Sequence, residues 1–167
     1  QWNIISEPLN YSYHFETGDK DFERHGFGGI WGGLHASFHH NLLAHCNSRM
    51  PRFDGTRNAK MENCDFRNNV IYNWGNENAA YGGEVQIPGG KSTINIVNNY
   101  YKPGPATPET LKFVEAYYAP EKAKGFGQWY VNENVMAGNP NLTKNNWQGV
   151  DLSRVPEEGR DKAKSEK

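Results

Sequence analysis

An asparagine followed by a short apolar run recurs along this chain, at intervals of roughly 30 residues. The four copies read HHNLLAH, RNNVIYN, VNNYYKP and NENVMAG. Because a repeated segment places the same strand at the same point of each structural unit, the pattern predicts units that stack strand upon strand. An amide repeated at one bend would form a hydrogen-bonded ladder through the stack. The residues concerned are Asn41, Asn69, Asn99 and Asn134.

Ordinary turn chemistry is the alternative explanation of this pattern. Asparagine tolerates left-handed backbone and bonds to its own backbone, and the chain contains 20 of them. Only 36% of the residues are hydrophobic, but 13% are aromatic and supply large buried areas, which argues against disorder. We therefore predict one globular domain over residues 1–155. The charged segment 156–167 has no large apolar residue, and we expect it to fray.

Brief β-rich runs interrupted by Gly, Pro and Asn make up most of the chain. Helical periodicity is confined to TPETLKFVEAYYA, residues 107–119, where Thr107 can cap and Pro108 can occupy the first helical position. The predicted class is all-β with one short helix near 107–119. The β-rich runs are WNIISEPL, SFHHNLLAH, DFRNNVIYNW, TINIVNNYYKPG and WYVNENVMAG.

Charge and hydrophobicity exclude several kinds of partner. A formal net charge of −1 gives no overall field toward nucleic acid or an anionic membrane. No apolar run approaches the roughly 18 to 20 residues of a membrane span. Cys46 and Cys64 lie at different offsets from the asparagine of their own repeats, so we predict that they do not form an essential disulfide.

Three other candidate sites carry weaker signals. All six histidines lie between His14 and His45, but no Cys or Glu spacing completes a zinc ligand set. HGFGGIWGG departs from the spacing of a phosphate-binding loop and is better explained as a tight bend that carries Trp31. The carboxylates that would suit glycoside hydrolysis have no marked pairing, and the candidates are Asp65, Glu77 and Glu84.

The segment SRMPRF places Arg49 and Arg52 around Pro51, where a strand should turn. A solvated basic turn is the simpler explanation, because proline fixes its own φ and arginine is common on surfaces. A local anion-binding site is the alternative.

SFHHNLLAHCNSRMPRF, followed by FRNNVIYNWG, NIVNNYY and GNP, resembles the C-terminal half of the pectate lyases, from about Trp2 to about Val150. The specific part of the resemblance is an H-H-N strand with R-x-P ten residues after its first His. The resemblance implies a right-handed parallel β-helix, a polysaccharide lyase that cleaves polygalacturonate or a related uronan by β-elimination, secretion or periplasmic location, and calcium as cofactor. It also implies an open N-terminal end, which a partner chain or further N-terminal coils would cover.

In that family the arginine before x-Pro is the base, so the resemblance assigns this role to Arg49. Arginine is a poor base because its reference pKa lies far above neutral pH, so the role requires a desolvated, cationic pocket. Arg52 would suit a bidentate carboxylate clamp, with Lys20 and Arg57 as further substrate-binding cations. The position five residues after the base, often Arg in the family, is Asp54 here. The family's calcium-binding acids belong to coils before Trp2, so no calcium ligand is identified in this chain.

If these roles hold, Arg49 and Arg52 should emerge on the outer face into one groove, and Met50 and Phe53 would be free to pack or to shape the groove wall. Two alternatives stay open. One is a glycoside hydrolase acting on galacturonan, and the other is a non-catalytic sugar-binding or structural β-helix. An absorbance assay separates them from a lyase, because only elimination leaves a conjugated unsaturated uronate.

Overall fold

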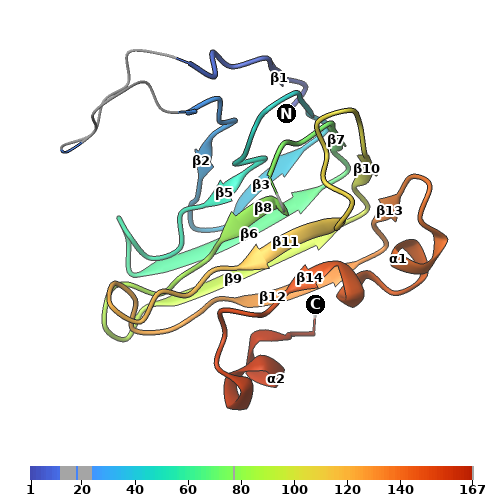
Figure 1. The fold of residues 1–167 in the computed structure, drawn as a ribbon. Helices are drawn as coiled ribbons and strands as arrows, with labels where there is room; N and C mark the ends of the chain where they lie inside the picture. The colour runs from blue at the N-terminus through green and yellow to red at the C-terminus, as the bar shows by residue number, and fades with distance from the viewer. Residues whose placement is uncertain (12–17, 19–23, 77, 167) are drawn as a thin grey trace.

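The computed structural model describes residues 1–11, 18, 24–76 and 78–166. It is an all-β protein in which the named strands form three parallel sheets (Figure 1). The chain visits the three sheets in turn, so that every third strand joins the same sheet. The predicted all-β class is confirmed by this arrangement.

The first sheet holds, in spatial order, β1 (Ile4–Ser6), β4 (Leu42–Ala44), β7 (Val70–Tyr72), β10 (Tyr100–Lys102) and β13 (Val135–Met136). The second holds β14 (Val150–Asp151), β11 (Lys112–Ala116), β8 (Asn78–Gly82), β5 (Arg52–Phe53) and β2 (Ile30–Trp31). The third holds β12 (Gln128–Asn132), β9 (Lys91–Val97), β6 (Met61–Arg67) and β3 (Ala36–His39). The helices are α1 (Pro140–Lys144) and α2 (Arg160–Ala163), with 3₁₀ turns η1 (Asn146–Gly149) and η2 (Glu157–Gly159).

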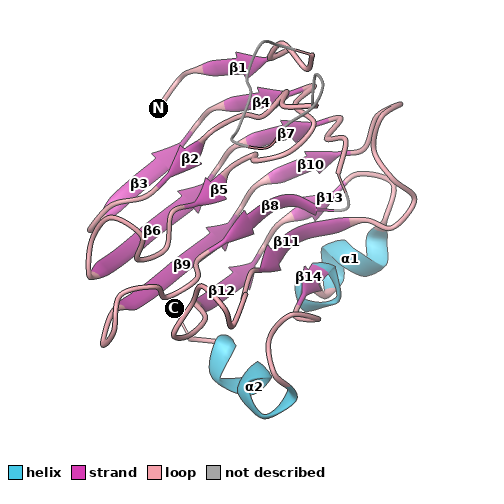
Figure 2. Cartoon of the chain, turned by 60° about the vertical axis from the view of Figure 1, so that its left-hand side comes forward, coloured by secondary structure: helices cyan, strands magenta, loops and turns pink. Residues whose placement is uncertain are grey.

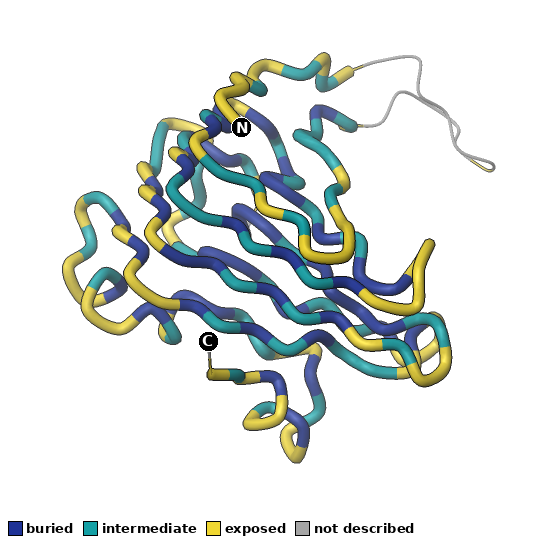
Figure 3. The backbone as a smooth tube through the Cα atoms, turned by 180° about the vertical axis from the view of Figure 1, so that it is seen from behind, coloured by how far each residue is buried: buried dark blue, intermediate teal, exposed yellow. Residues whose placement is uncertain are grey.

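The core lies between the three sheets and consists of side chains stacked in register. Alternate residues of each long strand point inward, which gives the banded burial of Figure 3. In the first sheet one inward row pairs equivalent positions of successive strands, and its members are Ile5, Leu43, Ile71, Tyr101 and Met136. A row in the third sheet comprises Phe38, Phe66, Ile96 and Val131. Because the same position of each repeat is apolar, one continuous core is buried.

The predicted asparagine ladder is confirmed. The Asn41 backbone N–H and side-chain Nδ2 both donate to Asn69 Oδ1, at 3.0 and 2.9 Å. The same pair of bonds joins Asn69 to Asn99 and Asn99 to Asn134. Asn3 adds a rung before Asn41, bonded to it in the same way. Each buried amide is thereby satisfied by the next repeat rather than by water.

A left-handed residue precedes each of the first five asparagines of the ladder, Asn3, Asn41, Asn69, Asn99 and Asn134. Its φ lies between 54° and 60°, a conformation that asparagine tolerates and that most other residues adopt only at a cost of about 1–2 kcal/mol. This residue turns the chain sharply between the third and the first sheet, which places the following amide inside the stack. The residues concerned are Trp2, His40, Asn68, Asn98 and Glu133.

The helices lie at the C-terminal end of the stack, opposite β1 (Figure 2). Asn146, from η1, accepts from the Asn134 backbone N–H at 2.7 Å and so supplies the last rung of the ladder. Beyond it, the segment expected to fray instead forms η2 and α2. Ala163 is fully buried, and the Ser165 N–H donates to the Trp129 carbonyl at 2.8 Å, so this segment covers the edge of β12.

The helix predicted over 107–119 is wrong, since residues 112–116 form β11. Val114 pairs with Ala80 of β8 on one side and with Val150 of β14 on the other. Pairing on both sides satisfies the backbone, and this outweighs the helical spacing of the apolar residues. Thr107, expected to cap a helix, instead accepts from the Gly104 N–H in a turn.

The cysteine prediction is confirmed, because Cys46 and Cys64 are free and buried. Burial raises the pKa of the Cys46 thiol to about 11. Among the residues that the structure describes, no helix has both the length and the apolar character needed to span a bilayer.

Glu62 introduces a carboxyl group at the rim of the core. It is 2% exposed, its Oε2 accepts from Ser92 Oγ at 2.6 Å, and burial raises its pKa from 4.5 to about 7. A raised pKa means that the folded protein favours the neutral acid. The associated stability is therefore complete below pH 4.5 and is lost as the pH rises through about 7.

We expect Glu62→Gln to remove this dependence. From pH 5 to pH 8, the free energy of unfolding of the wild type should fall by about 2 kcal/mol relative to that of the variant. Urea unfolding at both pH values measures the difference. Glu121→Gln, at an exposed carboxylate, is the control and should follow the wild type. Equal pH dependence in wild type and Glu62→Gln would contradict the assignment.

Candidate active site

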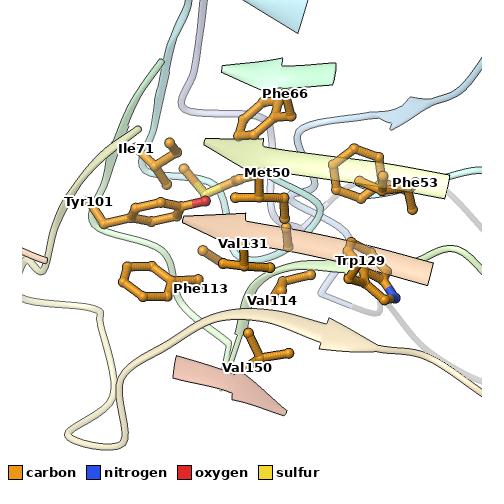
Figure 4. Close-up of a cluster of buried hydrophobic side chains, with 14 of the residues drawn as sticks. Met50, Phe53, Phe66, Ile71, Tyr101, Phe113, Val114, Trp129, Val131 and Val150 are labelled. Carbon is orange, nitrogen blue, oxygen red and sulfur yellow. The ribbon is translucent and has the colours of Figure 1, made fainter. Parts of the chain in front are cut away.

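The turn predicted from SRMPRF lies between β4 and β5. Some of its side chains point into the core and others point to the outer face. Met50 and Phe53 are fully buried and point into the core, as Figure 4 shows. Of the two expectations for these side chains, packing is confirmed and shaping a groove wall is not. The alternation of β5 that turns Arg52 outward turns Phe53 inward. Arg49 has a left-handed φ of 59° and is half-buried.

The glycine-rich stretch HGFGG supports this turn. The Gly29 N–H donates to the Arg49 carbonyl at 2.9 Å, and the Arg52 N–H donates to the Gly29 carbonyl at 2.9 Å. A Cβ at Gly28 would lie 2.4 Å from the Arg49 carbonyl oxygen, so only glycine permits this approach. The bend expected to carry Trp31 thus also forms the backbone cradle of the arginine turn.

Two aromatic residues hold the Arg49 guanidinium. Its Cζ lies 4.3 Å from the centroid of the Phe27 ring, and its Nε donates to the Tyr81 hydroxyl at 3.2 Å. Stacking shields one face of the guanidinium, and the Nε bond fixes its rotation. These two contacts leave both terminal Nη groups unbonded within the described part of the chain.

Arg52 is held differently. Its Nη2 forms an ion pair with Glu84 Oε1, whose side chain is 2% exposed, while the Arg52 side chain is 14% exposed. Gln86 Nε2 also donates to Glu84 Oε1, at 3.2 Å. The charge of Arg52 is therefore largely balanced within the protein, so Arg52 is not the open cation that a carboxylate clamp requires.

Two cavities open on the outer face of the second sheet, and we call them together the tyrosine groove. Tyr81 and Tyr117 line both, with ring centroids 5.8 Å apart. The strand register places Arg52, Tyr81 and Glu115 in one outward row, which explains why these side chains meet. The first cavity, about 370 Å³, is also lined by Arg52, Arg57, Glu84, Gln86, Ala119, Lys122 and Ala123. The second, about 400 Å³, is also lined by Phe27, Ser48, Asn76, Asn78, Glu115 and Arg154.

The two cavities differ in charge. Arg57 and Lys122 are exposed cations at the first cavity. In the second, Glu115 accepts from Arg154 Nε at 2.5 Å and from Asn78 Nδ2 at 3.3 Å. The hydrogen bond to Glu115 raises the pKa of Arg154. The first cavity therefore offers the cations that a carboxylate ligand needs, whereas the second is nearly balanced.

The other residues selected from the sequence are not all brought together. Arg57 lines the first cavity, whereas Lys20 and Glu77 lie outside the described residues. Asp65, on β6, faces Arg67 in the third sheet, so it forms no pair with Glu84. Sequence reasoning missed Phe27, Tyr81, Tyr117 and Lys122. The only signal for Tyr81 was its position as the one large side chain in the strand NAAYG.

Calcium, implied by the resemblance, has no complete ligand set among the residues that the structure describes. No group of three or more His, Cys, Asp or Glu side chains able to hold a metal ion occurs in ranges 1–11, 24–76 and 78–166. The carboxylates nearest the groove are engaged, Glu84 by Arg52 and Glu115 by Arg154. An engaged carboxylate would have to give up its ion pair before it could bind a cation.

Comparison with known proteins finds partial relatives of this chain. No protein-family model matches the chain. Over 97 residues it is 36% identical to a probable pectate lyase C of Aspergillus flavus, and over 92 residues it is 36% identical to one of Aspergillus terreus. A third, from Aspergillus fumigatus, is 34% identical over 94 residues. Each match covers 54% of this chain and 20% of the relative, so the chain spans about a fifth of the length of the curated relatives it matches.

These partial relatives support at most a relationship to the polysaccharide lyases, and the parallel sheets fit it. Within this class, the partial relatives support a pectate lyase-like relationship.

Proposed function

We propose that this chain carries the catalytic arginine of a pectate lyase-like enzyme that cleaves polygalacturonate or a related uronan by β-elimination. The observation that carries the proposal is the Arg49 guanidinium, stacked on Phe27 and bonded to Tyr81 beside a groove with exposed cations. The proposed fold is a right-handed parallel β-helix, supported by three parallel sheets visited in strict rotation and by the asparagine ladder. An extracellular or periplasmic location follows from the substrate.

In the proposed reaction, neutral Arg49 removes the C5 proton of a uronate residue. The electron pair of that bond forms a C4–C5 double bond, and the bond from C4 to the glycosidic oxygen breaks. The departing oxygen takes a proton from water, and protonated Arg49 returns its proton to the hydroxide that remains. The products are a new sugar end and an unsaturated uronate. Negative charge develops beside the uronate carboxylate, and cations stabilise it best when they are already in position.

Within the first cavity, Arg57 and Lys122 are the residues we assign to the substrate carboxylate. Arg52 is assigned a supporting role, because its pair with Glu84 fixes the wall of the same cavity. No step is assigned to calcium, because the carboxylates near the groove are engaged.

The proposal is tested by incubating the full translation product that contains this chain with polygalacturonate, with and without calcium chloride. Release of ultraviolet-absorbing unsaturated uronate supports elimination. New reducing ends without absorbance would indicate a hydrolase, and binding without cleavage would indicate a sugar-binding β-helix.

Tyr81 is expected to act as a positioning residue for Arg49. Tyr81→Phe keeps the ring but removes the acceptor for Arg49 Nε, so kcat should fall about tenfold while KM stays nearly constant. Initial rates of absorbance increase measure both constants. Tyr130→Phe, on the third sheet, is the matched control and should leave both unchanged. A rise in KM with constant kcat in Tyr81→Phe would assign Tyr81 to substrate binding instead.

A further inference from the structure

A separate cavity of about 320 Å³ gathers lysines from three segments of the chain. Lys91 begins β9, Lys124 lies in the loop before β12, and Lys162 belongs to α2. All three are exposed. We call this cavity the lysine cavity.

Among the residues that the structure describes, no acidic side chain lines the lysine cavity. Its other lining residues are neutral, namely Val85, Gly89, Gly90, Ser92, Gly125, Phe126 and Gln128. Within residues 24–76 and 78–166, none of its lysines lies within ion-pair distance of a carboxylate. The three lysine charges around the lysine cavity repel each other, and this repulsion lowers the stability of the folded protein. A bound anion would replace the repulsion with attraction.

The walls favour a sugar over a small inorganic anion. Phe126 and Val85 provide an apolar surface, and Gln128 provides an amide. Ligand sites typically combine such a surface with a few polar groups in volumes of about 300–1,000 Å³. A sugar ring can pack its C–H face against the phenyl ring while its carboxylate reaches a lysine.

The lysine cavity lies beside the tyrosine groove. The Val85 N–H donates to the Gly125 carbonyl at 2.8 Å, and the Lys124 N–H donates to the Val85 carbonyl at 2.6 Å. Glu84 and Ala123, which immediately precede Val85 and Lys124 in the sequence, line the groove, whereas Val85 and Lys124 line the lysine cavity. One bridged pair of segments therefore separates the two hollows.

We propose that the lysine cavity is a second, non-catalytic binding site for carboxylated oligosaccharide. It would hold a stretch of an acidic polysaccharide whose neighbouring stretch occupies the groove. The choice of a uronan as ligand rests on the proposed function, whereas the cationic cavity does not. Two linked contacts on one polymer raise its overall affinity without a new catalytic group.

The test uses ¹⁵N-labelled chain titrated with unesterified tetragalacturonate at physiological salt. The amides of Gly89, Gly90 and Gly125 should shift saturably. The double variant Lys124→Gln with Lys162→Gln should weaken that binding about tenfold, since each lost cation contact is worth a modest fraction of the affinity. Lys102→Gln with Lys144→Gln, two exposed lysines elsewhere, is the matched control and should bind like the wild type.

Two further ligands test whether the lysine cavity recognises both the carboxylate and the sugar. Fully methyl-esterified tetragalacturonate should fail to shift these amides, and acetate at equal carboxylate concentration should shift them only weakly. Equal shifts with acetate, equal binding by the esterified sugar, or shifts confined to the amides of Tyr81 and Tyr117 would each overturn the lysine site. Absence of unsaturated product would overturn the proposed function alone, because this titration requires no turnover.

Discussion

Replacing Arg49 with lysine should slow the release of unsaturated uronate by about 10²- to 10⁴-fold, the range expected when a general base is lost. Lysine keeps a positive charge but has neither the planar face that stacks on Phe27 nor the Nε–H that donates to Tyr81. Substrate binding should change far less, because Arg57 and Lys122 still line the cavity. The measurement is kcat and KM from absorbance, made on the full translation product.

Arg67→Lys is the matched control. Arg67 lies on β6 in the third sheet, where its guanidinium faces Asp65 at 3.6 Å, and it lines neither cavity of the tyrosine groove. Its replacement should leave both constants unchanged. If Arg49→Lys released unsaturated uronate at a near-normal rate, the lyase mechanism would be wrong, and SRMPRF would be an ordinary basic turn.

The parts of the fold that repeat were predictable from the sequence. Each bend between the third and the first sheet needs a left-handed residue followed by an amide that reaches the next repeat. That requirement is local, so it leaves the same short pattern at Asn41, Asn69 and Asn99. The free cysteines followed from the same alignment.

The parts that depend on partners distant in sequence were not predictable. Lys112–Ala116 has apolar residues at helical spacing, and its strand conformation is imposed by β8 and β14. Arg52 looked like an open clamp because Glu84, its partner, lies 32 residues further along the chain. The SRMPRF motif identifies the arginine and the turn that carries it. The carboxylate that neutralises this arginine belongs to another repeat, so the motif does not reveal it.

The tyrosine groove likewise has one part that the sequence predicts and one part that it does not. Arg49 could be selected through the resemblance that the H-H-N strand and R-x-P carry, yet its geometry depends on Phe27 and Tyr81, which no motif marks. Their roles follow only from the close approach of Gly28 to the Arg49 carbonyl and from the register of β5 with β8.

Loss of one asparagine from the ladder should greatly lower the free energy of unfolding. Asn99 is 1% exposed, and its Oδ1 accepts from the Asn69 backbone N–H and from Asn69 Nδ2, at 2.9 and 3.0 Å. Its own Nδ2 donates to the Phe66 carbonyl at 3.0 Å and to Asn134 Oδ1 at 3.0 Å. One side chain therefore satisfies buried polar groups of the repeats before and after it.

Asn99→Ala should lower the free energy of unfolding by about 4 kcal/mol, because leaving each buried polar group unpaired costs about 1–3 kcal/mol. Urea unfolding followed by circular dichroism measures the loss. Asn132→Ala is the matched control, since that residue is exposed and its one side-chain bond reaches the Tyr130 hydroxyl, and it should cost less than about 0.5 kcal/mol. Equal losses in the two variants would mean that water replaces the ladder bonds, and the stack would then be held by its apolar rows alone.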